Sequence, residues 1–186
     1  GHKDGDSVYD HPTPIDEDGT LKRTLESIRI IKNQDFQLVI LVSPTSEELT
    51  DRAKEKVNKI LSEVNLDIQT FIFTPAELEK IKALATEQDV DQSVIKLMNI
   101  RGYANVRNMC IYTAYILGAE MAMLIDDDEL FEKEDFVDLA SQYIGGRLYG
   151  KTIDGVAGYY LNKYGNYYDD VDIEPWMTYW DRFGFK

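Results

Sequence analysis

Short apolar runs alternate with amphipathic segments along the first 125 residues, and this alternation predicts an α/β fold. Residues 36–42 and 121–125 are nearly continuous apolar runs, and residues 67–73 form a third candidate strand. Runs of this length without polar alternation are typical of strands that are buried on both faces, as in a parallel sheet. Val8 and Tyr9 would be the stub of a first strand.

Segments with apolar residues at helical spacing lie between these runs. One begins near Thr20, and another spans residues 103–117 and ends at Gly118. Glycine is common just beyond a helix C-terminus. Two further helices are predicted by start signals, which are a capping-box pattern at Thr45 and Glu48 and a second start at Thr74, Pro75 and Glu77. The stripe expected to be buried in the helix over 103–117 consists of Ala104, Ile111, Ala114 and Leu117.

Strands that alternate with helices favour parallel pairing through right-handed crossovers. The predicted fold is therefore a three-layer α/β/α sandwich around a mostly parallel sheet. Residues 83–100 are polar and predict a loop followed by a short helix. After Tyr143 the chain becomes rich in glycine and tyrosine, with a candidate strand at 155–160. We expect one domain over residues 1–186, with a first part at about 8–143 and a second at 144–186.

Composition narrows the classes of function. The 186 residues carry a net charge of −14, which argues against sequence-independent binding of nucleic acid, because phosphate backbones need a basic surface. Cys110 is the only cysteine, so no intramolecular disulfide is expected, and no apolar run is long enough for a transmembrane helix. With no cationic, apolar leader at the start, the chain is predicted to be cytoplasmic. The sequence does not indicate its oligomeric state.

Four consecutive acids, Asp126 to Glu129, follow the apolar run 121–125. Like charges so close together repel one another unless they are solvated or neutralised. A Mg²⁺ or Mn²⁺ ion held by one or two carboxylates and by substrate phosphates would offset this repulsion. The alternative is a strand-to-helix turn, where the N-terminus of the next helix favours negative charge.

A second segment with candidate chemistry lies about twenty residues upstream. Gly102 precedes the predicted helix, and Arg107 and Asn108 lie near its start. Glycine allows close approach of the backbone, a helix N-terminus attracts phosphate, and arginine adds a planar set of donors. Capping and surface roles are the alternative for these residues.

Together the two segments resemble the donor-binding half of family 2 glycosyltransferases of the GT-A fold. The resemblance rests on the Gly-x-x-x-x-Arg-Asn pattern at Gly102 to Asn108, on the helix that ends at Gly118, and on the Asp-x-Asp pattern at 126–128. It covers most of residues 8–160, including a looser similarity from Val8 through residues 12–14 to Ile28. The family commonly has an acidic residue after its second strand to recognise the base, whereas this chain has Ser43, Pro44 and Thr45.

The resemblance implies transfer of a sugar from a nucleoside-diphosphate sugar to the hydroxyl of an unidentified acceptor, assisted by Mn²⁺ or Mg²⁺. The metal site it implies consists of Asp126 and Asp128, with Asp126 contacting either the ribose or a metal-bound water. The donor site it implies consists of Asp10, Pro12, Arg107, Asn108, Asp126 and Asp127, with His11 and Thr13 in the same turn as Pro12. Candidates for the catalytic base are the acids Asp169, Asp170, Asp172 and Glu174, and Trp176 and Trp180 are candidates for a sugar platform.

Other functions remain as alternatives. Residues 16–20 mimic the nucleophile loop of haloacid-dehalogenase-like phosphatases, but the prolines at 12 and 14 argue against the buried strand that this loop requires. A nucleotidyltransferase on a related fold would need a glycine-rich basic loop near the first strand, which the sequence lacks. The alternatives without turnover are a nucleotide-sugar-binding module and an acidic calcium-binding surface, although the spacing of 126–129 does not fit an EF-hand.

Overall fold

The computed structural model describes Tyr9, residues 13–158, Leu161 and Gly165. The chain divides into two compact units, residues 1–141 and residues 142–186. Within the described residues no helix is long and apolar enough to cross a membrane.

The first unit is a mixed α/β structure. Its elements, in order, are α1 (Leu21–Ser27), the 3₁₀ turn η1 (Ile28–Ile30), β1 (Leu38–Leu41), η2 (Glu47–Leu49), α2 (Thr50–Val64), β2 (Thr70–Phe73), α3 (Pro75–Glu87), α4 (Gln92–Leu97), α5 (Tyr103–Ile116) and α6 (Phe136–Ser141). Strands β1 and β2 pair in parallel, with Leu38 opposite Thr70 and Leu41 opposite Phe73. The predicted α/β class and the parallel pairing are confirmed.

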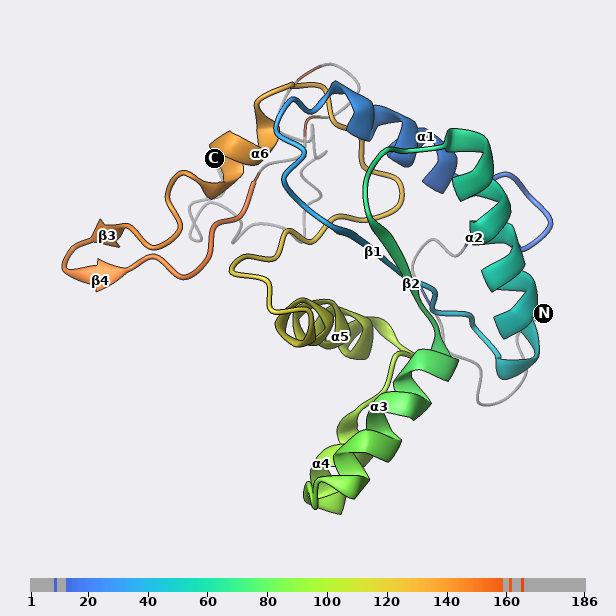
Figure 1. The fold of residues 1–186 in the computed structure, drawn as a ribbon. Helices are drawn as coiled ribbons and strands as arrows, with labels where there is room; N and C mark the ends of the chain where they lie inside the picture. The colour runs from blue at the N-terminus through green and yellow to red at the C-terminus, as the bar shows by residue number, and fades with distance from the viewer. Residues whose placement is uncertain (1–8, 10–12, 159–160, 162–164, 166–186) are drawn as a thin grey trace, which may run out of the picture. The chain divides into compact units, whose positions relative to one another are not determined.

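Side chains of β1 alternate between two hydrophobic clusters on opposite faces of the sheet. Leu38 and Ile40 pack against the cluster formed with α1 and α2, whereas Val39 and Leu41 pack against the cluster formed with α3 and α5. Figure 1 shows the same arrangement, with α1 and α2 on one side of the two strands and α3 and α5 on the other. The alternation follows from the two-residue repeat of a strand. Within the described residues this sheet has two strands, so the predicted three-layer sandwich is not confirmed.

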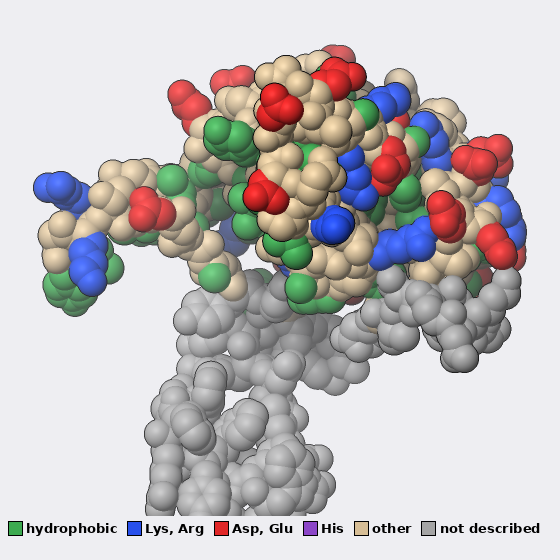
Figure 2. All heavy atoms as spheres, turned by 90° about the horizontal axis from the view of Figure 1, so that it is seen from below, with side chains coloured by type: hydrophobic (Ala, Val, Ile, Leu, Met, Phe, Trp, Pro, Cys, Tyr) green, Lys and Arg blue, Asp and Glu red, His purple; other side chains and the backbone are tan. Residues whose placement is uncertain are grey.

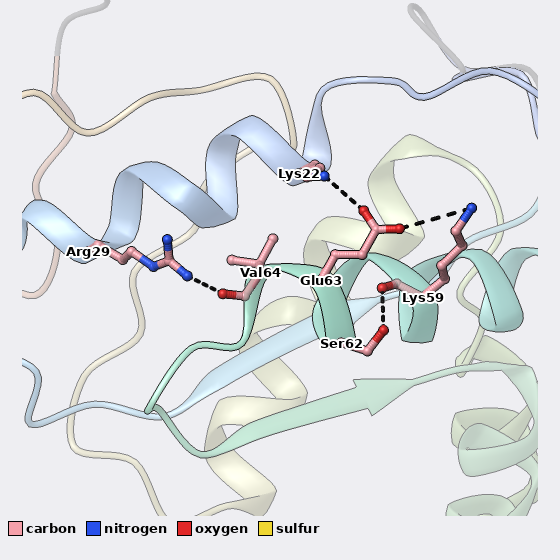
Figure 3. A network of polar contacts seen from close by, with 6 residues as sticks. All are labelled: Lys22, Arg29, Lys59, Ser62, Glu63 and Val64. Atoms are coloured by element: carbon pink, nitrogen blue, oxygen red, sulfur yellow. Dashed lines mark hydrogen bonds and ion pairs between the residues drawn. The ribbon is translucent and has the colours of Figure 1, made fainter.

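Polar contacts hold α1 against α2 at two places (Figure 3). Lys22 of α1 pairs with Glu63 of α2 at 2.8 Å, and Lys59 approaches the same carboxylate at 4.0 Å. Just after α1, the guanidinium of Arg29 in η1 donates to the carbonyl oxygen of Val64. Carbonyls in the last turn of a helix lack intrahelical partners, so Arg29 acts as a C-terminal cap for α2.

The start signal predicted for α3 and the glycine stop predicted after residue 117 are both confirmed. Thr74 caps α3 through Ala76 N–H, Glu77 accepts from the Thr74 N–H, and Pro75 takes the first helical position. Helix α5 and its C-cap residue Leu117 are followed by Gly118, whose φ is +71°. Gly118 N–H donates to Tyr115 O and Ala119 N–H to Ala114 O, which is the Schellman pattern.

Replacing Thr74 by alanine is expected to lower the free energy of unfolding by about 1 kcal/mol, because the buried cap hydroxyl is lost. Urea denaturation measures this change. The control is Thr86→Ala at the other end of α3, where the exposed hydroxyl donates to Lys82 O and alanine is a better helix former. Equal losses in the two variants would contradict a capping role.

Three predictions about the helices were wrong. Helix α2 does not begin with a capping box at Thr45 and Glu48. The 3₁₀ turn η2 precedes it, and Ser46, the N-cap of η2, makes no side-chain cap hydrogen bond. Residues 83–87 continue α3 instead of forming a loop. The stripe predicted for α5 is also misplaced, since Ile111 is 59% exposed and Met109 and Thr113 are buried. Thr113 is tolerated in the core because its hydroxyl donates to the Met109 carbonyl.

The predicted strand 121–125 is also wrong. These residues belong to no helix or strand, and they form no ladder with any described strand. Ile125 is the only β-branched residue among the five, and methionine, alanine and leucine favour helices over strands. Hydrophobicity alone therefore overstated the tendency of this run to form a strand.

The described part of the second unit is a short hairpin. Strands β3 (Arg147–Leu148) and β4 (Lys151–Thr152) pair antiparallel. They are joined by Tyr149 and Gly150, whose φ angles of +49° and +77° suit the two central residues of a tight hairpin turn. The sequence analysis missed this hairpin. Of the strand predicted at 155–160, residues 155–158 are not a strand, and 159–160 lie outside the described residues.

Candidate functional site

The acidic residues 126–129 form a closed turn. The Glu129 N–H donates to the Asp126 carbonyl at 3.3 Å, and the Asp126 N–H donates to Glu129 Oε2 at 2.8 Å. Asp127 and Asp128 occupy the two central positions of the turn and are exposed. The carboxylate of Glu129 is thus used within the turn, and that of Asp127 accepts a hydrogen bond from the Thr20 side chain, whereas that of Asp128 has no partner among the described residues.

Arg107 joins this turn to the start of α5. Its Nη2 atom donates to both carboxylate oxygens of Asp126, at 2.6 and 2.7 Å, and the two side chains are 30% and 44% exposed. The same nitrogen lies 3.3 Å from the Tyr103 hydroxyl, and the guanidinium carbon lies 5.3 Å from the centre of the Tyr103 ring. Tyr103 and Asp126 both raise the pKa of Arg107, although burial opposes them. Arg107 therefore stays charged and links two predicted parts of the donor site.

Electrostatic conditions in the turn favour a nearby cation. Burial raises the pKa of Asp127, and the carboxylates of Asp128 and Asp126 add to this effect. The N-terminus of the next helix, α6, does not explain the acids, because α6 begins only at Phe136. The Asp127 carboxylate instead accepts from Thr20, the N-cap residue of α1. Negative charge in this turn is thus offset at Asp126 by Arg107, whereas Asp127 has a hydrogen bond from Thr20 but no ion pair with any described residue.

The acidic turn and the residues after it are also attached to α1 and to Lys32. The Thr24 hydroxyl donates to the Asp127 carbonyl at 2.7 Å, and the Phe131 N–H donates to the Ser27 hydroxyl at 3.1 Å. The Lys32 N–H donates to the Glu134 carbonyl at 2.8 Å. These bonds anchor the backbone of residues 127–134, which carries the turn.

A polar network at the carboxyl end of β1 positions the start of α5. The Ser43 hydroxyl bonds the Ile100 carbonyl and the Tyr9 hydroxyl, and the Gly102 N–H donates to the same Tyr9 oxygen at 3.0 Å. Gly102 has a φ of +84°, which favours glycine at this N-cap. The hydroxyl of Ser43 is thus engaged within the protein. Arg107 lies on the helix that begins next to the sheet end where ligands of open α/β sheets bind.

The acidic turn offers one or two carboxylates, and not a complete set of ligands, to a divalent cation. Among the described residues, no group of three or more His, Cys, Asp or Glu side chains is arranged to hold a metal. Asp126 is paired with Arg107, whereas Asp128 is exposed and has no hydrogen bond or ion pair with another described residue. Mg²⁺ and Mn²⁺ sites in nucleotide enzymes use one or two carboxylates and take their other ligands from phosphates and water. Asp128 fits that use directly, and Asp126 fits it once the pair with Arg107 opens.

Comparison of the chain with known protein families, with curated proteins and with solved structures finds no match.

The structure does not test the roles predicted for several other site residues. Asn108 lies next to Arg107 but is exposed on α5. Asp10, His11 and Pro12 lie outside the described residues, as do the acids proposed as the catalytic base, Asp169, Asp170, Asp172 and Glu174, and the tryptophans Trp176 and Trp180. Their roles stay predictions.

Tyr103 is the residue that the sequence analysis missed at this site. A signal was present, because an aromatic residue four positions before an arginine lies on the same helix face. The sequence pattern predicts only a strand position for Tyr9. Its hydrogen bond with the Gly102 N–H depends on tertiary structure that no local pattern indicates.

Residues 16–20, the phosphatase-like motif, form part of a different feature. Glu17 N–H bonds Pro14 O in a turn, and Asp16 pairs with Arg52 of α2 at 2.6 Å. This turn and the helices α1 and α2 line a groove of about 690 Å³ with charged walls. Figure 2 shows one face of the molecule, where acidic and basic side chains of the described residues are interspersed and form no single basic stripe. The motif is thus held to α2 by ion pairing.

Proposed function

We propose that this chain binds a nucleoside-diphosphate sugar and acts as the donor-binding part of a glycosyltransferase of GT-A type. The observation that supports this most is the pair between Arg107 and Asp126 at 2.6 Å, which brings a phosphate-binding cation and an acidic turn together. The sequence resemblance assigns both segments to the donor site. Their meeting in space is what a site for a diphosphate and its cation requires.

Each residue has a distinct task in this proposal. Arg107 binds a donor phosphate through its guanidinium, and the N-terminus of α5 adds favourable dipole orientation for the same charge. Asp128 holds Mn²⁺ or Mg²⁺, which when bound supplies Lewis-acid stabilisation of the leaving diphosphate. Asp126 exchanges its contact with Arg107 for a contact with the ribose or the hydrated cation. The bonds from Thr24 and Ser27 keep the turn in place during this exchange.

Calorimetric titration with UDP and with GDP, each with and without Mn²⁺, tests the proposal. We expect binding of at least one nucleotide to depend on Mn²⁺, and the Asp128→Asn variant to lose that dependence. Glu132→Gln is the control, because it removes the charge of another exposed acid a few residues along the same segment. Failure of both nucleotides to bind under every condition would contradict the proposed function, whereas unchanged Mn²⁺ dependence in Asp128→Asn would contradict only the assigned ligand.

A further inference from the structure

Tyr103 occupies a defined place at the carboxyl end of β1. It is the first residue of α5, directly after Gly102, whose N–H is bonded to Tyr9 at 3.0 Å. The Tyr9 hydroxyl also contacts Ser43, the second residue after β1. The backbone that carries the ring is therefore fixed to the end of the sheet by a chain of hydrogen bonds.

The ring itself is held by Arg107. The guanidinium lies 5.3 Å from the ring centre, within the range of a cation–π contact, and its Nη2 atom donates to the hydroxyl at 3.3 Å. Arg107 is in turn held by both oxygens of Asp126. A tyrosine has few rotatable bonds, so these contacts leave the ring little freedom.

The same ring is 63% exposed. The guanidinium lies over the ring at 5.3 Å from its centre, and most of the residue nevertheless remains open to solvent. An immobilised aromatic ring that remains open to solvent can stack on a planar ligand at a small cost in conformational entropy. Tyr112 of the same helix differs, since it packs against the hydrophobic core.

We propose that Tyr103 stacks on the nucleobase of the bound nucleoside diphosphate. This inference rests on the proposed function and adds the part of the site that contacts the base. Arg107, beside the ring, takes the phosphates, and the ribose spans the distance between phosphate and base. Ser43, at the sheet end, has its hydroxyl bonded to Ile100 and Tyr9, so it is not free to recognise the edge of a base.

Stacking on an aromatic face tolerates every base, because each base has a π-face. The inference therefore predicts a contribution from the base without strong selection among bases. UDP and GDP should bind within about tenfold of each other, since hydrogen-bond readout is not the source of affinity.

The test compares UDP with inorganic pyrophosphate, both in the presence of Mn²⁺, by calorimetry on the full chain. Tyr103→Leu is expected to weaken UDP binding about fivefold to a hundredfold and to leave pyrophosphate binding within about twofold. Tyr103→Phe keeps the ring and should retain UDP binding within about threefold. Tyr115→Leu is the control, because Tyr115 is 79% exposed on the same helix at a distant position.

The outcomes separate this inference from the proposed function. Wild-type protein that binds pyrophosphate as tightly as UDP would overturn stacking and leave the diphosphate site intact. Equal weakening of both probes in Tyr103→Leu would also overturn it, because the residue would then act only by positioning Arg107. A variant that loses affinity for UDP-glucose but not for UDP would place the sugar, and not the base, on the ring. Wild-type protein that binds neither probe would reject both proposals.

Discussion

The Arg107→Gln variant should bind UDP about tenfold to a hundredfold more weakly than the wild type, and it should bind Mn²⁺ more tightly when no nucleotide is present. Hydrogen bonds to charged groups contribute about 1.5–3 kcal/mol, and each 1.4 kcal/mol corresponds to tenfold in affinity. Glutamine removes the guanidinium charge from the phosphate site. It also frees the Asp126 carboxylate, both of whose oxygens accept from Arg107.

The two halves of this result are linked. If phosphate binding draws Arg107 away from Asp126, then UDP should raise the affinity for Mn²⁺, and Mn²⁺ should raise the affinity for UDP by the same factor. Titration of Mn²⁺ with and without UDP measures this factor in the wild type and in Arg107→Gln, where it should shrink. The control is Arg52→Gln, which removes an exposed arginine whose pair with Asp16 has the same 2.6 Å separation. Equal Mn²⁺ affinity in the wild type and Arg107→Gln would contradict the exchange.

The Leu25→Ala variant should lose about 2–5 kcal/mol of stability. Leu25 is 1% exposed and packs with Ile28, Ile60 and Val64 between α1 and α2. Alanine loses the transfer free energy of the removed atoms and leaves a cavity that the surrounding helices fill only partly. Urea denaturation followed by circular dichroism measures the free energy of unfolding.

Leu84→Ala provides the comparison for this variant. Leu84 also lies on a helix, α3, but it is 59% exposed, so its truncation should change stability by no more than about 0.5 kcal/mol. A similar loss in both variants would mean that the α1–α2 cluster is not the part of the core that limits stability.

Features encoded by neighbouring residues were predicted well from the sequence. The box at Thr74 and Glu77 and the Gly118 stop depend on residues only a few positions apart, and both are present. The runs that became β1 and β2 were also found, although each strand is shorter than its run. Their backbone pairs along only part of the apolar segment.

Features that depend on tertiary packing were predicted poorly. The orientation of α5 about its own axis could not be read from its sequence, because alanines and a satisfied threonine blur its apolar stripe. Apolar content alone also failed at 121–125, where no strand partner lies alongside among the described residues. In both cases the apolar residues were present, but their pattern did not specify which other element they would pack against.

The candidate site falls between these cases. Arg107 and Asp126 were each chosen from local motifs, but nothing in the sequence indicated that they would bond to each other. Their meeting depends on the direction in which the chain leaves α5 at Gly118 and on the bonds that hold residues 127–134 to α1 and Lys32.

Those bonds join segments that lie about a hundred residues apart in the chain, with separations of 103 for Thr24 and Asp127 and 104 for Ser27 and Phe131. Local unfolding of α1 would therefore remove the hydrogen-bond partners of the acidic turn, even though the turn itself closes within four residues. Ligand binding at the turn and local unfolding of α1 are therefore thermodynamically coupled. A ligand that binds only the closed turn would protect the amides of α1 from hydrogen exchange, including amides that it does not touch.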